Sequence, residues 1–125
     1  MLLDGAQNEA SARALASTVK RLIKYRKLIL VLGVSKDKDV KGILKHLVPI
    51  SDIIVLTRSN VADRALEPAA IRDMIKPKEK AAAITDGVGP ALKEAFSRAA
   101  PQDLVLVTGS LFVVGEARGM LVKKQ

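Results

Sequence analysis

The sequence opens with Met1-Leu2-Leu3-Asp4-Gly5-Ala6-Gln7-Asn8, a stretch typical of a strand end, a tight turn and a helix start. The two leucines are apolar, Gly5 can adopt backbone angles that other residues avoid, and Asn8 is a favourable helix N-cap. Such a unit places polar groups at the carboxyl edge of a sheet, where open α/β sheets bind ligands and helix N-termini favour anions. Asp4 and Asn8 are also common turn and cap residues, so the remaining chain must decide between the two interpretations.

The composition indicates one globular domain. The chain has 125 residues, of which 49% are hydrophobic and 27% charged. It contains no cysteine, which excludes disulfides and thiolate metal sites and agrees with a reducing cytoplasm. No apolar run approaches the ~20 residues that a membrane-spanning helix needs. We therefore expect a cytoplasmic protein without a membrane partner.

The net charge of +8 raises the question of nucleic-acid binding. The basic residues are spread over predicted helix ends and loops, where the helix dipole favours cations. Only three aromatic residues are present to stack on bases. A scattered, solvated basic surface is the better interpretation, and a nucleic-acid partner is disfavoured.

Short apolar runs and helical periodicity alternate along the chain. Continuous apolar runs predict buried strands at residues 27–33, 52–57 and 104–107, and residues 81–85 are a weaker strand placed mainly by position. Helical spacing predicts helices at residues 9–25 and 40–47, from Glu67-Pro68 onward, and from residue 86 or 87 to 99. Met74 and Phe96 are assigned to apolar helix faces, and Asp37 or Asp39 to a helix cap. Residues 111–122 are assigned as helix in their first part, although Val113 and Val114 favour strand.

This alternation predicts an α/β fold with a mostly parallel sheet and helices on both faces. The polar turns at residues 4–8, 33–39, 57–64, 85–87 and 108–110 all follow predicted strands and should meet at one sheet edge. The side chains expected to share that surface are Asp4, Gln7, Asp37, Lys38, Arg58, Arg64 and Ser110.

Four motifs, in order, resemble one enzyme family. Asp4-Gly5-Ala6-Gln7-Asn8 is similar to the Asp-Gly-Ala-His-Asn-Pro signature that opens the C-terminal domain of folylpolyglutamate synthase / dihydrofolate synthase, a Mur ligase superfamily member. Residues 33–39 resemble that family's Gly-x-x-x-Asp-Lys-Asp, and Arg64-Ala65 its Arg-Ala pair. Residues 103–118 resemble its closing Thr-Gly-Ser-Leu-(Tyr/Phe) stretch. Together the motifs span essentially the whole chain.

The resemblance implies a Rossmann-like, mainly parallel sheet of about six strands. It also implies a role in an ATP-dependent amide ligase that adds L-glutamate to folate. In such enzymes a carboxylate is activated as an acyl phosphate and the glutamate amino group attacks it. An N-terminal P-loop domain carries the magnesium ligands and most of the folate site, and the C-terminal domain closes over it.

The resemblance also assigns roles to individual residues. Asp4 matches a residue expected near the ATP ribose, and Ser110 one expected to hold glutamate. Gln7 occupies the position of the family's His, near the phosphates and the incoming glutamate. Lys38, Arg58 and Arg64 are candidates for interdomain or anion contacts, with a surface ion pair an equal alternative for Arg64.

Two departures from the family pattern limit what the chain can do alone. Gln7 cannot carry the positive charge of a His, and the only histidine, His46, lies near a predicted helix end, where a surface or dipole-related role is expected. No Gly-x-x-x-x-Gly-Lys-(Ser/Thr) phosphate loop occurs. We therefore expect no catalytic residue and no metal site in this chain, and no activity in isolation. It is either an excised C-terminal domain or a stand-alone nucleotide-binding or regulatory module.

Overall fold

The computed structural model describes residues 1–6, 8–59 and 65–123, and their centre is a five-stranded parallel sheet. In spatial order the strands are β1 (Leu2–Leu3), β5 (Leu104–Thr108), β2 (Leu28–Leu32), β3 (Ile53–Leu56) and β4 (Ala81–Ile84). Every neighbouring pair in this sheet runs parallel. The predicted parallel α/β architecture is confirmed, with five strands among the described residues where the resemblance implied about six.

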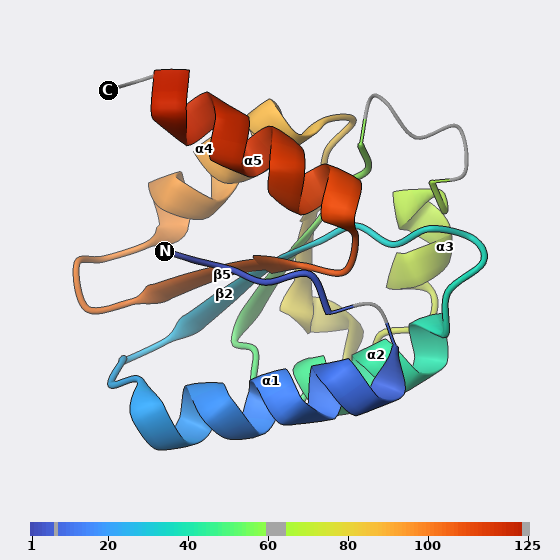
Figure 1. The fold of residues 1–125 in the computed structure, drawn as a ribbon, viewed down its shortest axis with the longest axis horizontal. Helices are drawn as coiled ribbons and strands as arrows, with labels where there is room; N and C mark the ends of the chain where they lie inside the picture. Colours follow the sequence, from blue (N-terminus) through green and yellow to red (C-terminus); the bar gives the residue numbers. More distant parts are fainter. Residues whose placement is uncertain (7, 60–64, 124–125) are drawn as a thin grey trace.

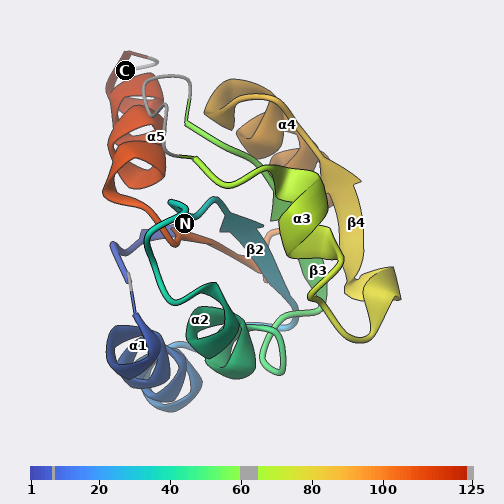
Figure 2. The same ribbon diagram turned by 90° about the vertical axis from the view of Figure 1, so that its right-hand side faces the viewer.

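Helices cover both faces of the sheet, as Figures 1 and 2 show. On one face lie α1 (Glu9–Leu22), α2 (Val40–Leu47) and the short α3 (Pro68–Arg72). On the other lie α4 (Val88–Arg98) and α5 (Leu111–Lys123). No helix within the described part of the chain is long and apolar enough to cross a membrane.

The central strand β2 supplies side chains to both halves of the core. All five of its residues are buried, and successive side chains in a strand point to opposite faces. Leu28, Leu30 and Leu32 pack in the cluster that contains the buried residues of α1, α2 and α3. Ile29 and Val31 pack with the buried residues of α4 and α5. A continuous apolar run is therefore the pattern that a strand covered on both faces requires.

Side-chain caps and a proline mark where the helices of the first face begin. Asn8 caps α1 in a capping box, in which its side chain accepts a hydrogen bond from Ser11 N at 2.8 Å and Ser11 Oγ accepts one from Asn8 N at 3.1 Å. Of the two predicted caps for α2, Asp39 is the one present, and its Oδ1 accepts from Gly42 N at 3.1 Å. Pro68 occupies the first turn of α3 as expected.

Three expectations from the sequence need adjustment. α1 ends at Leu22 instead of residue 25, because Ile23 adopts an extended conformation (φ −115°, ψ 125°). Met74 and Phe96, assigned to apolar faces, are 39% and 44% exposed, whereas the neighbouring Ile71, Ile75, Ala91 and Ala95 are buried. Residues 111–123 are helical throughout, so the helix assignment extends beyond its first part.

Candidate functional site at the carboxyl edge of the sheet

The strand order creates a crevice beside β5. The helices that follow β1 and β2 lie on one face, whereas α5, which follows β5 between them, lies on the opposite face (Figure 1). In open α/β sheets, ligands bind outside the carboxyl ends of the strands where the connections diverge in this way. The edge beside β5, where these connections diverge, is therefore a candidate ligand position.

The polar turns predicted to meet at one edge do follow the carboxyl ends of the five parallel strands, in their described parts. Several are in direct contact: Thr57 Oγ1 accepts from Gly87 N at 3.3 Å, and Gly33 N donates to Thr108 O at 3.4 Å. Gly109 has a φ of +103°, and a Cβ added there would lie 2.6 Å from Gly33 O. The edge is thus a connected layer of loops.

A cavity of about 470 Å³ opens in this layer, at the start of α1 and α2. That volume lies within the range of small-molecule sites. Polar side chains and one glycine line it: Gly5, Asn8, Ser11, Asp37, Lys38 and Asp39. Gly5 and Asn8 come from the turn after β1, and residues 37–39 come from the turn after β2, about thirty residues later in the sequence. The parallel sheet brings these two turns together.

The cavity has a mixed electrostatic character. Both N-cap residues, Asn8 and Asp39, line it, so the amino ends of α1 and α2 are directed to the same space. Helix amino ends and the half-buried Lys38 favour anions, whereas the carboxylates of Asp37 and Asp39 accept hydrogen bonds from hydroxyl groups. The arrangement suits a ligand that carries both phosphate and hydroxyl groups.

Asp4 and Ser110 lie at the same edge, each just after one of two adjacent strands, β1 and β5. Leu3 of β1 is in register with Val107 of β5, and Asp4 N donates to Val107 O at 3.0 Å. Ser110 is 6% exposed, and its Oγ accepts from Phe112 N at 3.2 Å, which places it at the start of α5. Neither residue lines the 470 Å³ cavity itself, and Asp4 is joined to it through Gly5.

Arg58 has two carboxylate partners that the sequence did not identify. Its Nε donates to Asp86 Oδ1 at 2.6 Å, and its Nη1 donates to Glu67 Oε1 at 2.8 Å. The hydrogen bond and charge of Asp86, and the charge of Glu67, raise the pKa of Arg58 above its ordinary value. Arg58 therefore joins the loops after β3 and β4 to the start of α3, and an anion contact by it stays a prediction.

Of the predicted interdomain or anion contacts that the structure describes, Lys38 lines the cavity and Arg58 does not. Gln7 and Arg64, which were also assigned through the family motifs, lie outside the residues that the structure describes. The expectation that these two side chains share the surface therefore stays a prediction. The turns that carry the other five expected side chains do lie at the carboxyl edge of the sheet.

Sequence reasoning did not single out two polar features of this edge. Thr108, at the end of β5, is fully buried, and its hydroxyl has no hydrogen-bond partner among the described residues. Ser59 Oγ donates to Glu116 Oε1 and so connects the loop after β3 to α5. The Thr-Gly-Ser triple at residues 108–110 was the available signal for Thr108, whereas nothing in the sequence relates residues 59 and 116.

His46 has a structural partner, in agreement with the expected surface role. Its Nε2 lies 3.1 Å from Glu9 Oε2, and Lys45 Nζ lies 3.5 Å from the same oxygen. The hydrogen bond from His46, followed by the charge of Lys45, lowers the pKa of Glu9. The cluster joins the end of α2 to the start of α1. Among the described residues, no group of three His, Cys, Asp or Glu side chains is arranged to hold a metal ion.

Comparison with known proteins agrees with this architecture. The dihydrofolate synthase/folylpolyglutamate synthase of Mycobacterium tuberculosis is 34% identical over 94% of this chain, which spans 27% of that relative. The folylpolyglutamate synthase of the same organism, solved in complex with ADP and AMPPCP, superposes with a TM-score of 0.83 at 33% identity, over 94% of this chain and 28% of that one. A bifunctional folylpolyglutamate synthase/dihydrofolate synthase from Yersinia pestis, solved with AMPPNP and Mn, has a TM-score of 0.84 at 26% identity, over 96% and 28%.

The chain therefore spans little more than a quarter of the relatives that it matches. Residues 1–111 match the family model described as "Mur ligase, glutamate ligase domain". This match covers the sheet, its first four helices and every strand-end turn described above. The chain belongs to the Mur ligase family of glutamate ligase domains.

Proposed function

We propose that this chain is the C-terminal domain of a folylpolyglutamate/dihydrofolate synthase, an ATP-dependent ligase that adds L-glutamate to a folate. Its partner in this proposal is an N-terminal P-loop domain of the same enzyme, which supplies the phosphate loop that the sequence lacks. The observation that carries the proposal is the polar cavity between the starts of α1 and α2, built from the family motifs. A cytoplasmic location belongs to the same proposal, and the absence of cysteine supports it.

The reaction has two balanced steps. The γ-phosphoryl group of ATP moves to the folate carboxylate, which gives an acyl phosphate and ADP. The glutamate nitrogen then attacks the acyl carbon, an amide bond forms, inorganic phosphate leaves and the nitrogen loses a proton. We assign Mg²⁺ to the N-terminal domain, where the family resemblance also places it. The contribution of this chain is binding and orientation of the reactants, together with exclusion of water when the domains close.

Each assigned side chain has a role that its chemistry supports. Asp4 would accept a hydrogen bond from the ribose, and Ser110 would bind the glutamate carboxylate. Lys38 and the amino ends of α1 and α2 would attract the phosphates. Gln7 would donate a hydrogen bond where the family has a His, and Arg58 and Arg64 would contact the anions or the partner domain.

A domain exchange tests the proposal. The matching quarter of the Mycobacterium tuberculosis relative would be replaced by residues 1–125, and incorporation of labelled glutamate into a folate would be measured with and without ATP. We expect ATP-dependent incorporation. A folded chimera that binds ATP but adds no glutamate would contradict the assignment.

A pair of lysine variants localises the effect within that chimera. Lys38→Gln should raise the KM for ATP by about two- to tenfold, because it removes a cation that lines the phosphate-attracting cavity. Lys93→Gln removes the same charge from the exposed surface of α4 and should leave the KM unchanged. If both substitutions raised the KM for ATP equally, the cause would be the lower net charge of the protein and not the loss of a contact in the cavity.

A stand-alone nucleotide-binding module is the second candidate. The observation that favours it is that the cavity and both helix amino ends are formed entirely by this chain. On this alternative the domain would bind ATP without an N-terminal partner and would not catalyse ligation.

A further inference from the structure

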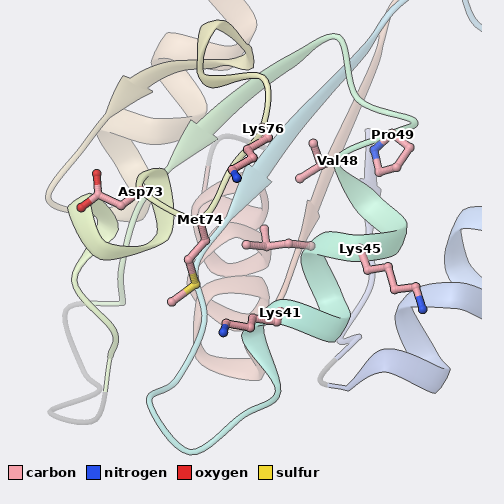
Figure 3. Close-up of a pocket in the computed structure, with 8 residues that line it drawn as sticks. Lys41, Lys45, Val48, Pro49, Asp73, Met74 and Lys76 are labelled. Atoms are coloured by element: carbon pink, nitrogen blue, oxygen red, sulfur yellow. The ribbon is translucent and has the colours of Figure 1, made fainter.

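A second cavity, of about 510 Å³, lies between α2 and the segment that follows α3 (Figure 3). We call it the α2–α3 cleft. It is open to solvent in the helical layer of the fold, whereas the cavity described above lies at the carboxyl edge of the sheet. Its residues belong to none of the family motifs, and none of the roles assigned above uses it.

The walls of the α2–α3 cleft are apolar on both sides. Leu44 and Val48 line it from α2 and its C-cap, and both are almost completely buried at 5% and 7% exposure. Met74, from the segment after α3, lies across the cleft from Val48, and 39% of its surface is exposed. A thioether side chain is flexible and polarisable and adapts to apolar ligands. The cleft therefore offers an apolar strip with one adaptable wall.

Two ammonium groups lie at the ends of this apolar strip. Figure 3 shows the Lys76 side chain directed into the cleft at one end and that of Lys41 at the other. Neither forms an ion pair with a residue that the structure describes. The other charged lining groups point away: Lys45 extends toward α1, where its Nζ lies 3.5 Å from Glu9, and the carboxylate of Asp73 is directed outward.

The composition of the cleft selects the class of ligand. A volume of about 510 Å³ corresponds to a small molecule, since such sites measure about 300–1,000 Å³. No aromatic side chain lines it, so a stacked nucleobase has no platform there. Cations at both ends of an apolar strip complement anions at both ends of an apolar body.

We infer that the α2–α3 cleft binds an elongated small molecule with an anionic group at each end and an apolar body between them. Lys41 and Lys76 each pair with one anionic group, and the apolar body packs between Met74 and the α2 residues Leu44 and Val48. This inference does not depend on the proposed ligase function, because it uses other residues and another surface.

Octanedioate is a suitable probe for the 125-residue chain, with octanoate and 1,8-octanediol as the monoanionic and neutral controls. Binding would be followed by methyl and amide chemical shifts. We expect saturable shifts at the Met74 methyl group and at Leu44 and Val48 with octanedioate, several-fold weaker binding of octanoate, and still weaker binding of the diol. Added salt should weaken the dianion most, since salt screens exposed charges.

Lysine variants separate the two end contacts from general attraction to a basic protein. Lys41→Gln and Lys76→Gln should each weaken octanedioate binding about two- to fivefold, the range of an exposed ion pair. Octanoate should be affected less, because its single carboxylate can still pair with the remaining lysine. Lys45→Gln, which removes an equal charge from the same wall but from a side chain that points away, should have no effect. Amide spectra of the variants would establish that each remains folded.

Three results would overturn the inference. The first is binding of octanoate as tight as that of octanedioate. The second is an equal loss with Lys45→Gln and Lys41→Gln. The third is the absence of saturable shifts at Met74, including the case in which shifts map to the cavity lined by Gly5 and Asn8.

Discussion

Gly109 is a residue at which the backbone of the candidate site depends on the absence of a side chain. Its φ of +103° is a conformation that L-residues rarely adopt, and an added Cβ would lie 2.6 Å from Gly33 O. Gly109→Ala should therefore lower the free energy of unfolding by about 1–3 kcal/mol. Urea denaturation would measure the change.

Gly119→Ala is the matched control for this substitution. Nothing lies within 4 Å of a Cβ added at Gly119, which is inside α5. Alanine at an open helical position should raise the stability by about 0.5–1 kcal/mol. A loss of stability at residue 119 that equals the loss at residue 109 would mean that backbone conformation and the contact with Gly33 are not the cause.

Asp103 gives the fold a defined pH dependence. Its carboxylate accepts hydrogen bonds from Arg26 Nε at 3.1 Å and from Ala100 N at 2.9 Å, and these bonds, that of Arg26 first, lower the pKa of Asp103 from 3.8 to about 2. The ionised form is thus favoured in the folded state. The stabilisation is complete above the unfolded-state pKa and is lost as the pH falls from 3.8 toward about 2.

The comparison of wild type with Asp103→Asn tests this dependence. The variant should be less stable at neutral pH, and the difference in free energy of unfolding should shrink as the pH is lowered through the interval from 3.8 to about 2. Asp73→Asn controls for the loss of one negative charge. A difference that stayed constant across this interval would show that the ionised carboxylate is not the stabilising form.

Single residues also mark where the sequence stops being informative. Arg58 and His46 are recognisable as polar residues, but their partners Asp86 and Glu9 lie 28 and 37 positions away in the sequence. Pairing over such separations depends on how the elements pack, and no local pattern encodes it. For this reason the sequence assigned Arg58 an anion contact and did not identify the two carboxylates beside it.

At the scale of elements, the caps of α1 and α2 should contribute both to stability and to the site. Asn8→Ala and Asp39→Ala should each lower the free energy of unfolding by about 1 kcal/mol, because each leaves a helix amide without its side-chain acceptor. Asn8 and Asp39 also line the cavity, so nucleotide affinity in the domain-exchange chimera should change with them. Urea denaturation and calorimetric titration would measure the two effects.

Ser17→Ala is the control for these caps. Ser17 is exposed within α1 and is not a cap, so its replacement should be neutral or slightly stabilising because alanine has the higher helix propensity. If the cap variants were as stable as Ser17→Ala, the side-chain hydrogen bonds at the helix starts would not contribute to the stability of the chain.

The helices and strands with the clearest local sequence patterns were the ones that could be predicted. The buried strands β2, β3 and β5 and the Pro signal of α3 follow from short, unambiguous stretches, whereas the cap of α2 was left open between Asp37 and Asp39. α5 was ambiguous because Val113 and Val114 favour strand, and its packing against the sheet through Val113 and Ala117 decides for helix. Gly42 inside α2 allows α1 and α2 to approach closely, because a Cβ there would lie 2.7 Å from Glu9 Cβ.

At the scale of the whole molecule, alternation of strands and helices predicted the parallel sheet but not the strand order. The order β1-β5-β2-β3-β4 requires the chain to cross from one edge of the sheet, at β4, to a position between β1 and β2. The path of the chain between these two positions depends on which face of the sheet each helix covers. The sequence therefore predicted that the turns at residues 4–8 and 33–39 meet at one edge of the sheet, but not that they line a cavity between the starts of α1 and α2.

At this scale the ligase proposal also makes a prediction about nucleotide affinity. The phosphate loop would come from another domain, so residues 1–125 alone should bind ATP at least tenfold more weakly than the domain-exchange chimera, about 1.4 kcal/mol in binding free energy. Isothermal titration of both proteins under the same salt conditions would give the ratio. Equal affinities would instead support the stand-alone nucleotide-binding module, because the chain would then supply every contact that matters for binding.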